Sequence, residues 1–294
     1  MTRLRFLVAL PLAVGFSLAH AATTVPLPPW MCSGTDTLFD SGFEAGEAVP
    51  SNPSHGSGGP YPGDESRSIE VPGSSPHLLY LYVPTVYSPQ RAMPLLLALH
   101  GTAGYGSAPN AARTVRNDWS SVAETYGFIV LAVAANGAEG SWDPVIDIPA
   151  IFAAIADTAS RYNIEQARLD MWGYSAGGHL AHGLGLNNTD FFTAYGVSAG
   201  ALTQYACSDD GSPPPSCSEL LGNAEPKIPV DIHIGNLDPL YLYYGAGNDP
   251  ARFEAGGWVL NQDLFYTLFA GGHIYTVAQL GEIWNNICPF ALAP

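Results

Sequence analysis

The sequence predicts an α/β fold: a doubly wound, mostly parallel sheet in a single domain. Short continuous apolar runs, such as residues 94–100 and 128–133, are typical of strands that are buried on both faces of a parallel sheet. Longer stretches whose apolar residues recur at helical spacing, such as 111–126, lie between such runs. Because strands and helices alternate, we expect successive βαβ units. A chain of 294 residues is long enough to bury a substantial core in one such domain.

The predicted elements follow this pattern from residue 67 onwards. An antiparallel pair comes first, because residues 67–71 and 78–83 are predicted strands and a Pro-Gly-Ser-Ser-Pro turn joins them. The strands at 94–100 and 128–133 then flank the helix at 111–126. Further strands are expected from residue 168 to Gly173 and at 194–198, 229–234 and 264–269, and further helices at 147–162, after Ser175 and at 277–287.

Residues 1–21 have the features of a signal peptide. Arg3 and Arg5 give a positive start, residues 6–18 are apolar, and Ala19-His20-Ala21 is a cleavage site of the A-x-A type. The apolar run is too short to span a bilayer, and no later run is long enough. We therefore expect a secreted or periplasmic protein that has no membrane attachment after cleavage.

The mature chain is predicted to begin with a segment that lacks regular structure. Residues 22–64 are rich in Pro, Gly and Ser, and 51–63 have the composition of a flexible linker. A catalytic domain is expected at 65–294. The acidic residues between 36 and 47 lack the spacing of a calcium-binding loop, so a solvated acidic segment is the favoured interpretation.

The charge balance excludes some partners. The formal net charge is −16, and removal of the leader with its two arginines makes it −18. So acidic a protein is repelled by phosphate backbones and by anionic membrane surfaces, which disfavours nucleic-acid binding. Neutral esters and polysaccharides remain compatible with this charge.

Four cysteines in an exported chain favour disulfides. Three pairings are possible. Cys207 and Cys217 bracket a short, turn-rich loop, and closing it would contribute about 2–3 kcal/mol to stability. Cys32 and Cys288 would then tie the N-terminal segment to the C-terminus. No C-x-x-C spacing is present, so we expect no metal site.

The motif Gly173-Tyr174-Ser175-Ala176-Gly177 lies between a predicted strand and a predicted helix. In this context the pattern G-x-S-x-G places a serine at a sharp turn above the sheet, with its hydroxyl exposed. The start of the following helix directs unpaired N–H groups and a positive dipole end toward the turn, where an oxyanion would form. A turn of small residues with an incidental serine is the alternative. The motif therefore requires a base, an acid and an oxyanion loop elsewhere in the chain.

His273 is the favoured base among eight histidines. It follows the last predicted strand in a loose Ala-Gly-Gly-His turn, downstream of every other candidate, where the order Ser…Asp…His places the base. The other histidines lie in the leader, in the linker, in an early turn, on or at the ends of strands, or on the helix after the serine: His20, His55, His77, His100, His233, His179 and His182.

The acid that orients the imidazole is predicted to be Asp238. It lies beyond the end of the strand at 229–234, where a loop can direct it to His273. Asp231, the main competitor, lies inside that strand. For the oxyanion we expect the backbone N–H groups of Ala176, directly after the serine, and of Thr102, in the loop after residues 94–100.

Several linked segments resemble one group of α/β-hydrolases, the exported polyhydroxybutyrate depolymerases and feruloyl esterases. They are residues 99–102 (Leu-His-Gly-Thr), 173–178 (Gly-Tyr-Ser-Ala-Gly-Gly), 233–239 (His-Ile-Gly-Asn-Leu-Asp-Pro) and 271–273 (Gly-Gly-His). The similarity covers about residues 66–290, and the helix at Asp147 with the Tyr-Asn-Ile segment after it also contributes. It implies a serine esterase without a cofactor, acting on polymer-linked or short-chain esters.

This chain departs from the group at two positions. Thr102 stands where a cysteine is frequent, which changes little because the backbone provides the hydrogen bond. Ile274 and Tyr275 follow the histidine, where Trp-Pro is frequent, and this difference bears on the substrate class.

Aromatic residues on the loops expected to face the site are candidates for a substrate pocket. They are Tyr105, Trp142, Tyr174 and Tyr241, which could stack on a phenolic or sugar ring or could simply anchor their loops. Two other functions remain open: a peptidase of the prolyl-oligopeptidase type, which uses the same triad, and a secreted binding protein that has kept the fold without activity.

Overall fold

The computed structural model describes residues 23–26, 32, 50–209 and 215–293. The predicted signal peptide and the acidic residues between 36 and 47 lie outside these ranges. Within the described residues, no helix is both long and apolar enough to cross a membrane.

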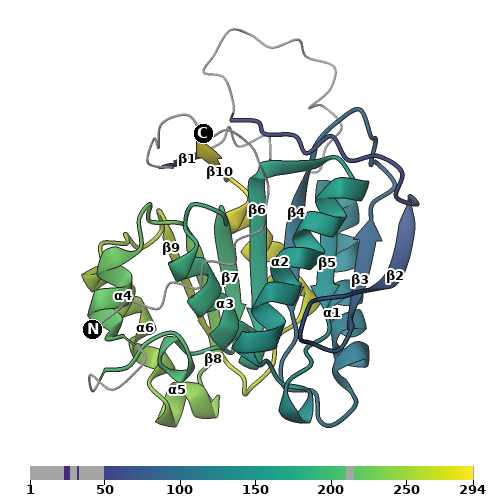
Figure 1. Ribbon diagram of the computed structural model, residues 1–294. Helices are drawn as coiled ribbons and strands as arrows, with labels where there is room; N and C mark the ends of the chain where they lie inside the picture. The colour runs from purple at the N-terminus through teal and green to yellow at the C-terminus, as the bar shows by residue number, and fades with distance from the viewer. Residues whose placement is uncertain (1–22, 27–31, 33–49, 210–214, 294) are drawn as a thin grey trace, which may run out of the picture.

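An eight-stranded sheet with the strand order β2-β3-β5-β4-β6-β7-β8-β9 forms the centre of the molecule (Figure 1). The pairs β2–β3 and β3–β5 are antiparallel, and all the other pairs are parallel. This arrangement confirms the predicted mostly parallel sheet. The strands are β2 (Gly63–Ile69), β3 (His77–Val83), β4 (Met93–Leu99), β5 (Ile129–Val133), β6 (Ile164–Tyr174), β7 (Ala194–Ser198), β8 (Val230–Gly235) and β9 (Leu264–Phe269).

Helices cover both faces of this sheet, and each face has its own apolar core. On one face, α2 (Pro144–Arg161) and α3 (Ala176–Asn187) pack their buried residues against the sheet. On the other, α1 (Ala108–Tyr126) and α7 (Val277–Ile287) do the same, and Phe128 stacks on Trp284 there. Strands β4, β5, β7 and β8 are buried along their whole length, which the continuous apolar runs of β4 and β5 predict. The doubly wound architecture is therefore confirmed.

The helix after β5 begins three residues earlier than its sequence pattern predicts. Pro144 occupies the first turn, where its missing N–H costs nothing, and the Asp143 side chain accepts a hydrogen bond from Val145 N. Three short helices, α4 (Cys217–Asn223), α5 (Pro239–Tyr243) and α6 (Asp249–Ala255), were not predicted. They are too short for a helical period to be recognised, and capping side chains rather than an apolar face mark where α4 and α5 begin.

The residues that were expected to be a flexible linker are packed against the domain. Ser54 N donates to Ile164 O, its hydroxyl donates to the carbonyls of Ala159 and Tyr162, and Gly59 N donates to Arg161 O. Pro and Gly residues here let the backbone lie against the end of α2 and the start of β6. Composition alone predicts such a stretch to be mobile, because it does not register hydrogen bonds to distant segments.

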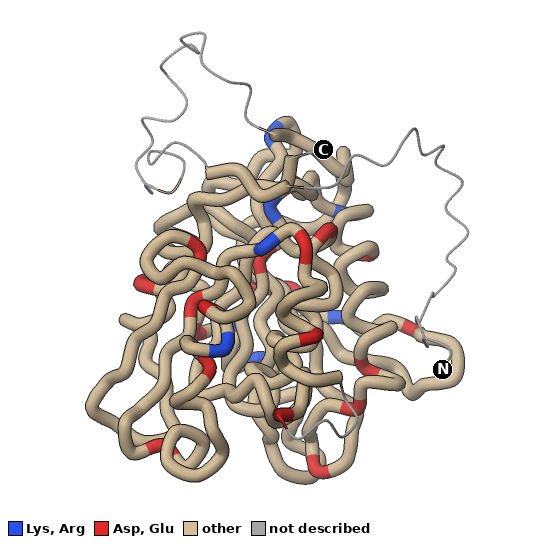
Figure 2. The backbone as a smooth tube through the Cα atoms, turned by 90° about the vertical axis from the view of Figure 1, so that its left-hand side faces the viewer, with Lys and Arg blue, Asp and Glu red and all other residues tan. Residues whose placement is uncertain are grey.

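The two ends of the described chain are joined to each other. Strand β1 (Thr23–Pro26) pairs antiparallel with β10 (Phe290–Ala293), next to a disulfide between Cys32 and Cys288. A second disulfide joins Cys207 and Cys217. Both pairings agree with those favoured from the sequence. Among the described residues, the acidic ones are spread over the molecule rather than gathered in one patch, and basic residues are few (Figure 2).

Candidate active site

Ser175 lies at a sharp turn between β6 and α3, and its backbone has φ 53° and ψ −119°. This conformation costs a non-glycine residue about 1–3 kcal/mol, so the surroundings must impose it. The hydrogen bonds from Ser175 N to Ser198 O and from His179 N to Ser175 O do so. A Cβ at Gly173 would collide with the Gly177 carbonyl, and one at Gly177 would collide with the Leu99 carbonyl. Both glycines of the motif are therefore required by the packing of this turn.

Three side chains from different loops form a continuous hydrogen-bonded chain at this turn. His273 Nε2 lies 2.7 Å from Ser175 Oγ, and His273 Nδ1 lies 2.9 Å from Asp238 Oδ2. Asp238 is fully buried, whereas the His273 side chain is 36% exposed. Asp238 Oδ1 also accepts a hydrogen bond from Leu240 N and so caps α5, which fixes the carboxylate. The structure thus brings together the three residues that the sequence order singled out.

The loop that carries His273 is held from both sides. The Tyr174 hydroxyl donates to His273 O at 2.8 Å, and the rings of Tyr174 and Tyr275 contact each other edge to face. Tyr275 in turn donates to Asp118 on α1. Leu237 N donates to Gly271 O, which ties the loop to the Asp238 loop. Tyr174 was expected to line the pocket, but its hydroxyl holds the backbone of His273 instead. The sequence does not indicate this contact.

The candidate oxyanion donors lie on two neighbouring segments. Ala176 N–H belongs to the first turn of α3, and Thr102 is exposed on the loop after β4. Trp142 braces this loop, because its indole N–H donates to His100 O at 2.8 Å. A hydrogen bond from Ala103 N to Gly140 O also holds this loop in place. The loop is thus held in place ahead of any substrate, as an oxyanion site requires.

A pocket of about 160 Å³ opens beside the serine, on the side of α3. Of the four predicted pocket residues it includes only Trp142. Tyr105 is 92% exposed, Tyr174 contacts His273, and Tyr241 packs beside Ala201 and Ile234. The lining residues come from three separate segments and are Ser141, Trp142, Pro144, Ala176, His179, Leu180, Gln204 and Tyr205.

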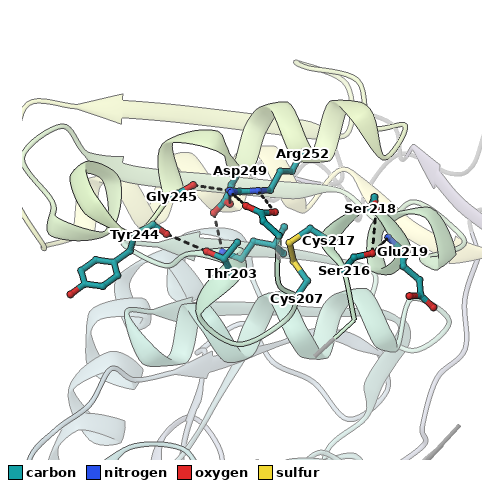
Figure 3. The surroundings of a disulfide bond; sticks show 12 residues. Thr203, Cys207, Ser216, Cys217, Ser218, Glu219, Tyr244, Gly245, Asp249 and Arg252 are labelled. Atoms are coloured by element: carbon teal, nitrogen blue, oxygen red, sulfur yellow. Dashed lines mark hydrogen bonds and ion pairs between the residues drawn. A yellow bond between two sulfur atoms is a disulfide. The ribbon is translucent and has the colours of Figure 1, made fainter. Parts of the chain in front are cut away.

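Gln204 and Tyr205 of the pocket lining follow residues 202 and 203, which a network of ion pairs and hydrogen bonds holds in place (Figure 3). Asp249, which is fully buried, accepts hydrogen bonds from Leu202 N at 3.0 Å and from Arg252 at 2.7 Å. Arg252 also donates to Gly245 O and pairs with Asp209, two residues from the disulfide at Cys207. Burial raises the pKa of Asp249 to about 7. Sequence reasoning missed this network because its members are unremarkable loop residues until the fold brings them together.

The remaining histidines and Asp231 have other surroundings. Asp231 is buried within β8 and contacts His233 and Asn286 instead of His273. His182 is fully buried against the Tyr195 hydroxyl, and burial lowers its pKa to about 3. Within the part of the chain that is described, no three His, Cys, Asp or Glu side chains are grouped as metal ligands would be.

Comparison with known proteins agrees with this fold. The model of the BD-FAE family, an esterase-like family of α/β-hydrolases, matches residues 79–203, somewhat less than half of the chain. No match was found among curated protein sequences.

Three solved structures share the fold over 76% of this chain. A ferulic acid esterase is 15% identical with a TM-score of 0.58, and 97% of that chain is covered. An S-formylglutathione hydrolase from Agrobacterium tumefaciens is 16% identical with a TM-score of 0.53 and 91% covered. A protein assigned as dipeptidyl aminopeptidase IV from Bacteroides ovatus is 14% identical with a TM-score of 0.59, and this chain spans only 35% of its length.

The fold and these similarities place the chain in the structural class of the α/β-hydrolase fold. Within that class, the chain is similar to the feruloyl esterase-like group.

Proposed function

We propose that the protein is a secreted serine ester hydrolase that works through an acyl-enzyme, with Ser175, His273 and Asp238 as its catalytic triad. The observation that carries this proposal is the 2.7 Å contact between Ser175 Oγ and His273 Nε2, with Asp238 on the other imidazole nitrogen. A serine hydroxyl is a weak nucleophile at neutral pH and needs such a base within hydrogen-bond distance. The leader at residues 1–21 and the two disulfides support export.

In the first half-reaction, Ser175 Oγ attacks the ester carbonyl while His273 Nε2 takes the hydroxyl proton. The N–H groups of Ala176 and Thr102 stabilise the oxyanion of the tetrahedral intermediate, and each such donor is worth about 3 kcal/mol. His273 then protonates the leaving alcohol as the carbon–oxygen bond breaks. In the second half-reaction, water loses a proton to His273, attacks the acyl-enzyme and releases the acid with regeneration of Ser175. Asp238 holds the imidazole tautomer and stabilises the imidazolium.

The experiment is the Ser175→Ala variant, assayed on p-nitrophenyl acetate and labelled with a fluorophosphonate. We expect labelling of the wild type at Ser175 and a loss of kcat of at least 10³-fold in the variant. Ser218→Ala, on the surface helix α4, serves as the matched control. Retention of substantial hydrolysis by Ser175→Ala would show that the triad assignment is wrong.

The substrate is proposed to be a polymer-linked or short-chain ester, such as a feruloyl or acetyl ester of a polysaccharide or a polyhydroxyalkanoate. The similarity to a ferulic acid esterase supports this class, and the similarity to a dipeptidyl aminopeptidase keeps a peptidase as the second candidate. Parallel assays on matched ester and amide substrates separate the two. A non-catalytic binding protein would give no fluorophosphonate labelling at all.

A further inference from the structure

The pocket beside Ser175 lies on the acyl side of the proposed reaction. His273 protonates the leaving alcohol, so the alcohol part of the ester must lie toward the His273 loop. The pocket lining includes Ala176, the residue after the serine, and none of its residues belongs to the His273 loop. A group bound in this pocket is therefore attached to the carbonyl carbon and stays with the enzyme in the acyl intermediate.

His179 provides the pocket with a donor whose tautomer is fixed by the backbone. Its Nδ1 lies 2.9 Å from Ala201 N and 3.2 Å from Ala201 O. A backbone N–H can only donate, and its residue Ala201 is fully buried, so Nδ1 must be the acceptor. The proton of the neutral ring then resides on Nε2. With Nδ1 held by Ala201, the edge that carries Nε2–H is the one left for the pocket.

The imidazole of His179 is neutral near pH 7. Burial lowers the pKa of His179 to about 4 and outweighs the contact with the Ala201 backbone, which raises it. No described residue accepts a hydrogen bond from Nε2. The other polar side chains of the lining are the exposed Gln204 amide, the Tyr205 hydroxyl and the Ser141 hydroxyl, which accepts from Thr102 Oγ1. Water can form hydrogen bonds with the exposed Gln204 amide. The half-buried Nε2–H has less access to water, so a hydrogen bond to the substrate stabilises it more.

We propose that His179 is a specificity-determining residue whose Nε2–H binds an oxygen atom carried by the acyl group of the substrate. This inference rests on the proposed function and extends it. The preferred substrates are esters whose acyl part is uncharged and bears an ether, hydroxyl or ester oxygen a few atoms from the carbonyl. A cavity of about 150 Å³ holds a benzene ring, so a pocket of about 160 Å³ has room for an oxygen-bearing ring or a short chain.

Matched p-nitrophenyl esters test this directly in the intact protein. One pair compares tetrahydropyran-4-carboxylate with cyclohexanecarboxylate, and the other compares 3-methoxypropanoate with pentanoate. Within each pair the acyl groups have nearly the same size and differ by one oxygen. We expect kcat/KM to favour the oxygen-bearing member of at least one pair about five- to tenfold, the value of one hydrogen bond. The two pairs distinguish a ring from a chain as the natural source of that oxygen.

Two variants of His179 then assign the preference to Nε2. In His179→Asn the side-chain oxygen can still accept from Ala201 N, but the donor is lost, so the ratio within the pair should fall to about one. In His179→Gln the amide N–H can occupy the place of Nε2–H, so part of the preference should return. Because the readout is a ratio between two substrates, a change in overall activity or in the folded fraction does not alter it.

Three results would overturn the proposal. The wild type could hydrolyse both members of each pair equally, His179→Asn could keep the preference, or Gln204→Leu or Tyr205→Phe could remove it while His179→Asn does not. The first of these needs no variant and so does not depend on whether one folds. Failure of the proposed function has a different signature, because Ser175→Ala would then retain hydrolysis of p-nitrophenyl acetate.

Discussion

Two aspartate–histidine pairs in this molecule have the same separation and different surroundings. Asp238 Oδ2 lies 2.9 Å from His273 Nδ1 at the end of the sheet, and the His273 side chain is 36% exposed. Asp147 Oδ1 lies 2.9 Å from His77 Nε2, and both of these side chains are fully buried. The first pair adjoins Ser175, whereas the second joins the start of β3 to the first turn of α2.

The difference lies in what else each pair contacts. The second nitrogen of His273 meets Ser175 Oγ, but His77 Nδ1 is buried and has no partner among the described residues. Asp147 also accepts hydrogen bonds from Asn136 N and Asp143 N, so it connects three segments next to the Trp142 brace. An aspartate–histidine contact is therefore not by itself a sign of chemistry. The pair becomes reactive where the imidazole is accessible and faces a nucleophile.

The variant with the largest expected effect on activity is Asp238→Asn, which tests whether the Asp238–His273 pair is catalytic. Asn can still cap α5, so the free energy of unfolding should change by less than about 1 kcal/mol. The imidazole tautomer is no longer held, and kcat should fall about 10⁴-fold. Steady-state kinetics on p-nitrophenyl acetate and thermal unfolding measure the two effects. A loss of activity below tenfold would contradict the assignment of Asp238.

The variant Asp147→Asn should have the opposite profile. It places an amide where three buried donors converge, and we expect a loss of about 3 kcal/mol of stability. The kcat of the folded protein should fall less than tenfold, because Asp147 does not touch the reacting atoms. Denaturant unfolding checks the first value. Asp157→Asn, which breaks a partly exposed pair with Arg67, is the control and should cost at most about 1 kcal/mol.

The dependence of stability on pH tests the buried His182. An unfolded histidine takes up a proton near pH 6.5, whereas His182 in the folded protein does so only near 3. Between these values the unfolded state binds more protons, so stability decreases as pH falls, by up to about 1.4 kcal/mol per unit. His182→Phe should make that slope shallower between pH 6 and pH 4. An unchanged slope in denaturant unfolding would show that burial does not keep His182 neutral.

The smallest effect is expected at a third pair, Asp231 and His233. Here the nitrogen–oxygen distances are 3.2 and 3.3 Å, and Asn286 also donates to the carboxylate. Asp231→Asn should cost about 1 kcal/mol of stability and change kcat less than twofold. A large fall in kcat with normal folding would instead make Asp231 the competitor of Asp238 that its position in the sequence suggested.

The triad candidates could be predicted from the sequence, because the nucleophile, the acid and the base follow one another in a fixed order along the chain. The motif around Ser175, the loop position of Asp238 and the last-strand position of His273 are local features, and parallel strands bring their carboxyl ends to one edge. The buried strands were recognisable because a strand covered on both faces must be apolar throughout.

The pocket could not be predicted in the same way. Its lining combines residues 141–144, 176–180 and 204–205, and only Trp142 among the four aromatic candidates faces it. Whether a loop side chain lines a cavity depends on hydrogen bonds between distant segments, such as those of Tyr174 with His273 and of Asp249 with Leu202. The packing of residues 50–62 escaped prediction for the same reason, whereas the three short helices were missed because they are too short for a helical period.

The sequence by itself determined the class of fold and the order of the nucleophile, acid and base, because periodicity and turn chemistry are properties of neighbouring residues. Only the tertiary structure decided which residues line the pocket beside the serine, and that His179 Nδ1 contacts the buried Ala201 backbone. Both depend on hydrogen bonds between segments that are distant along the chain, and such bonds form only when folding excludes water from the groups concerned.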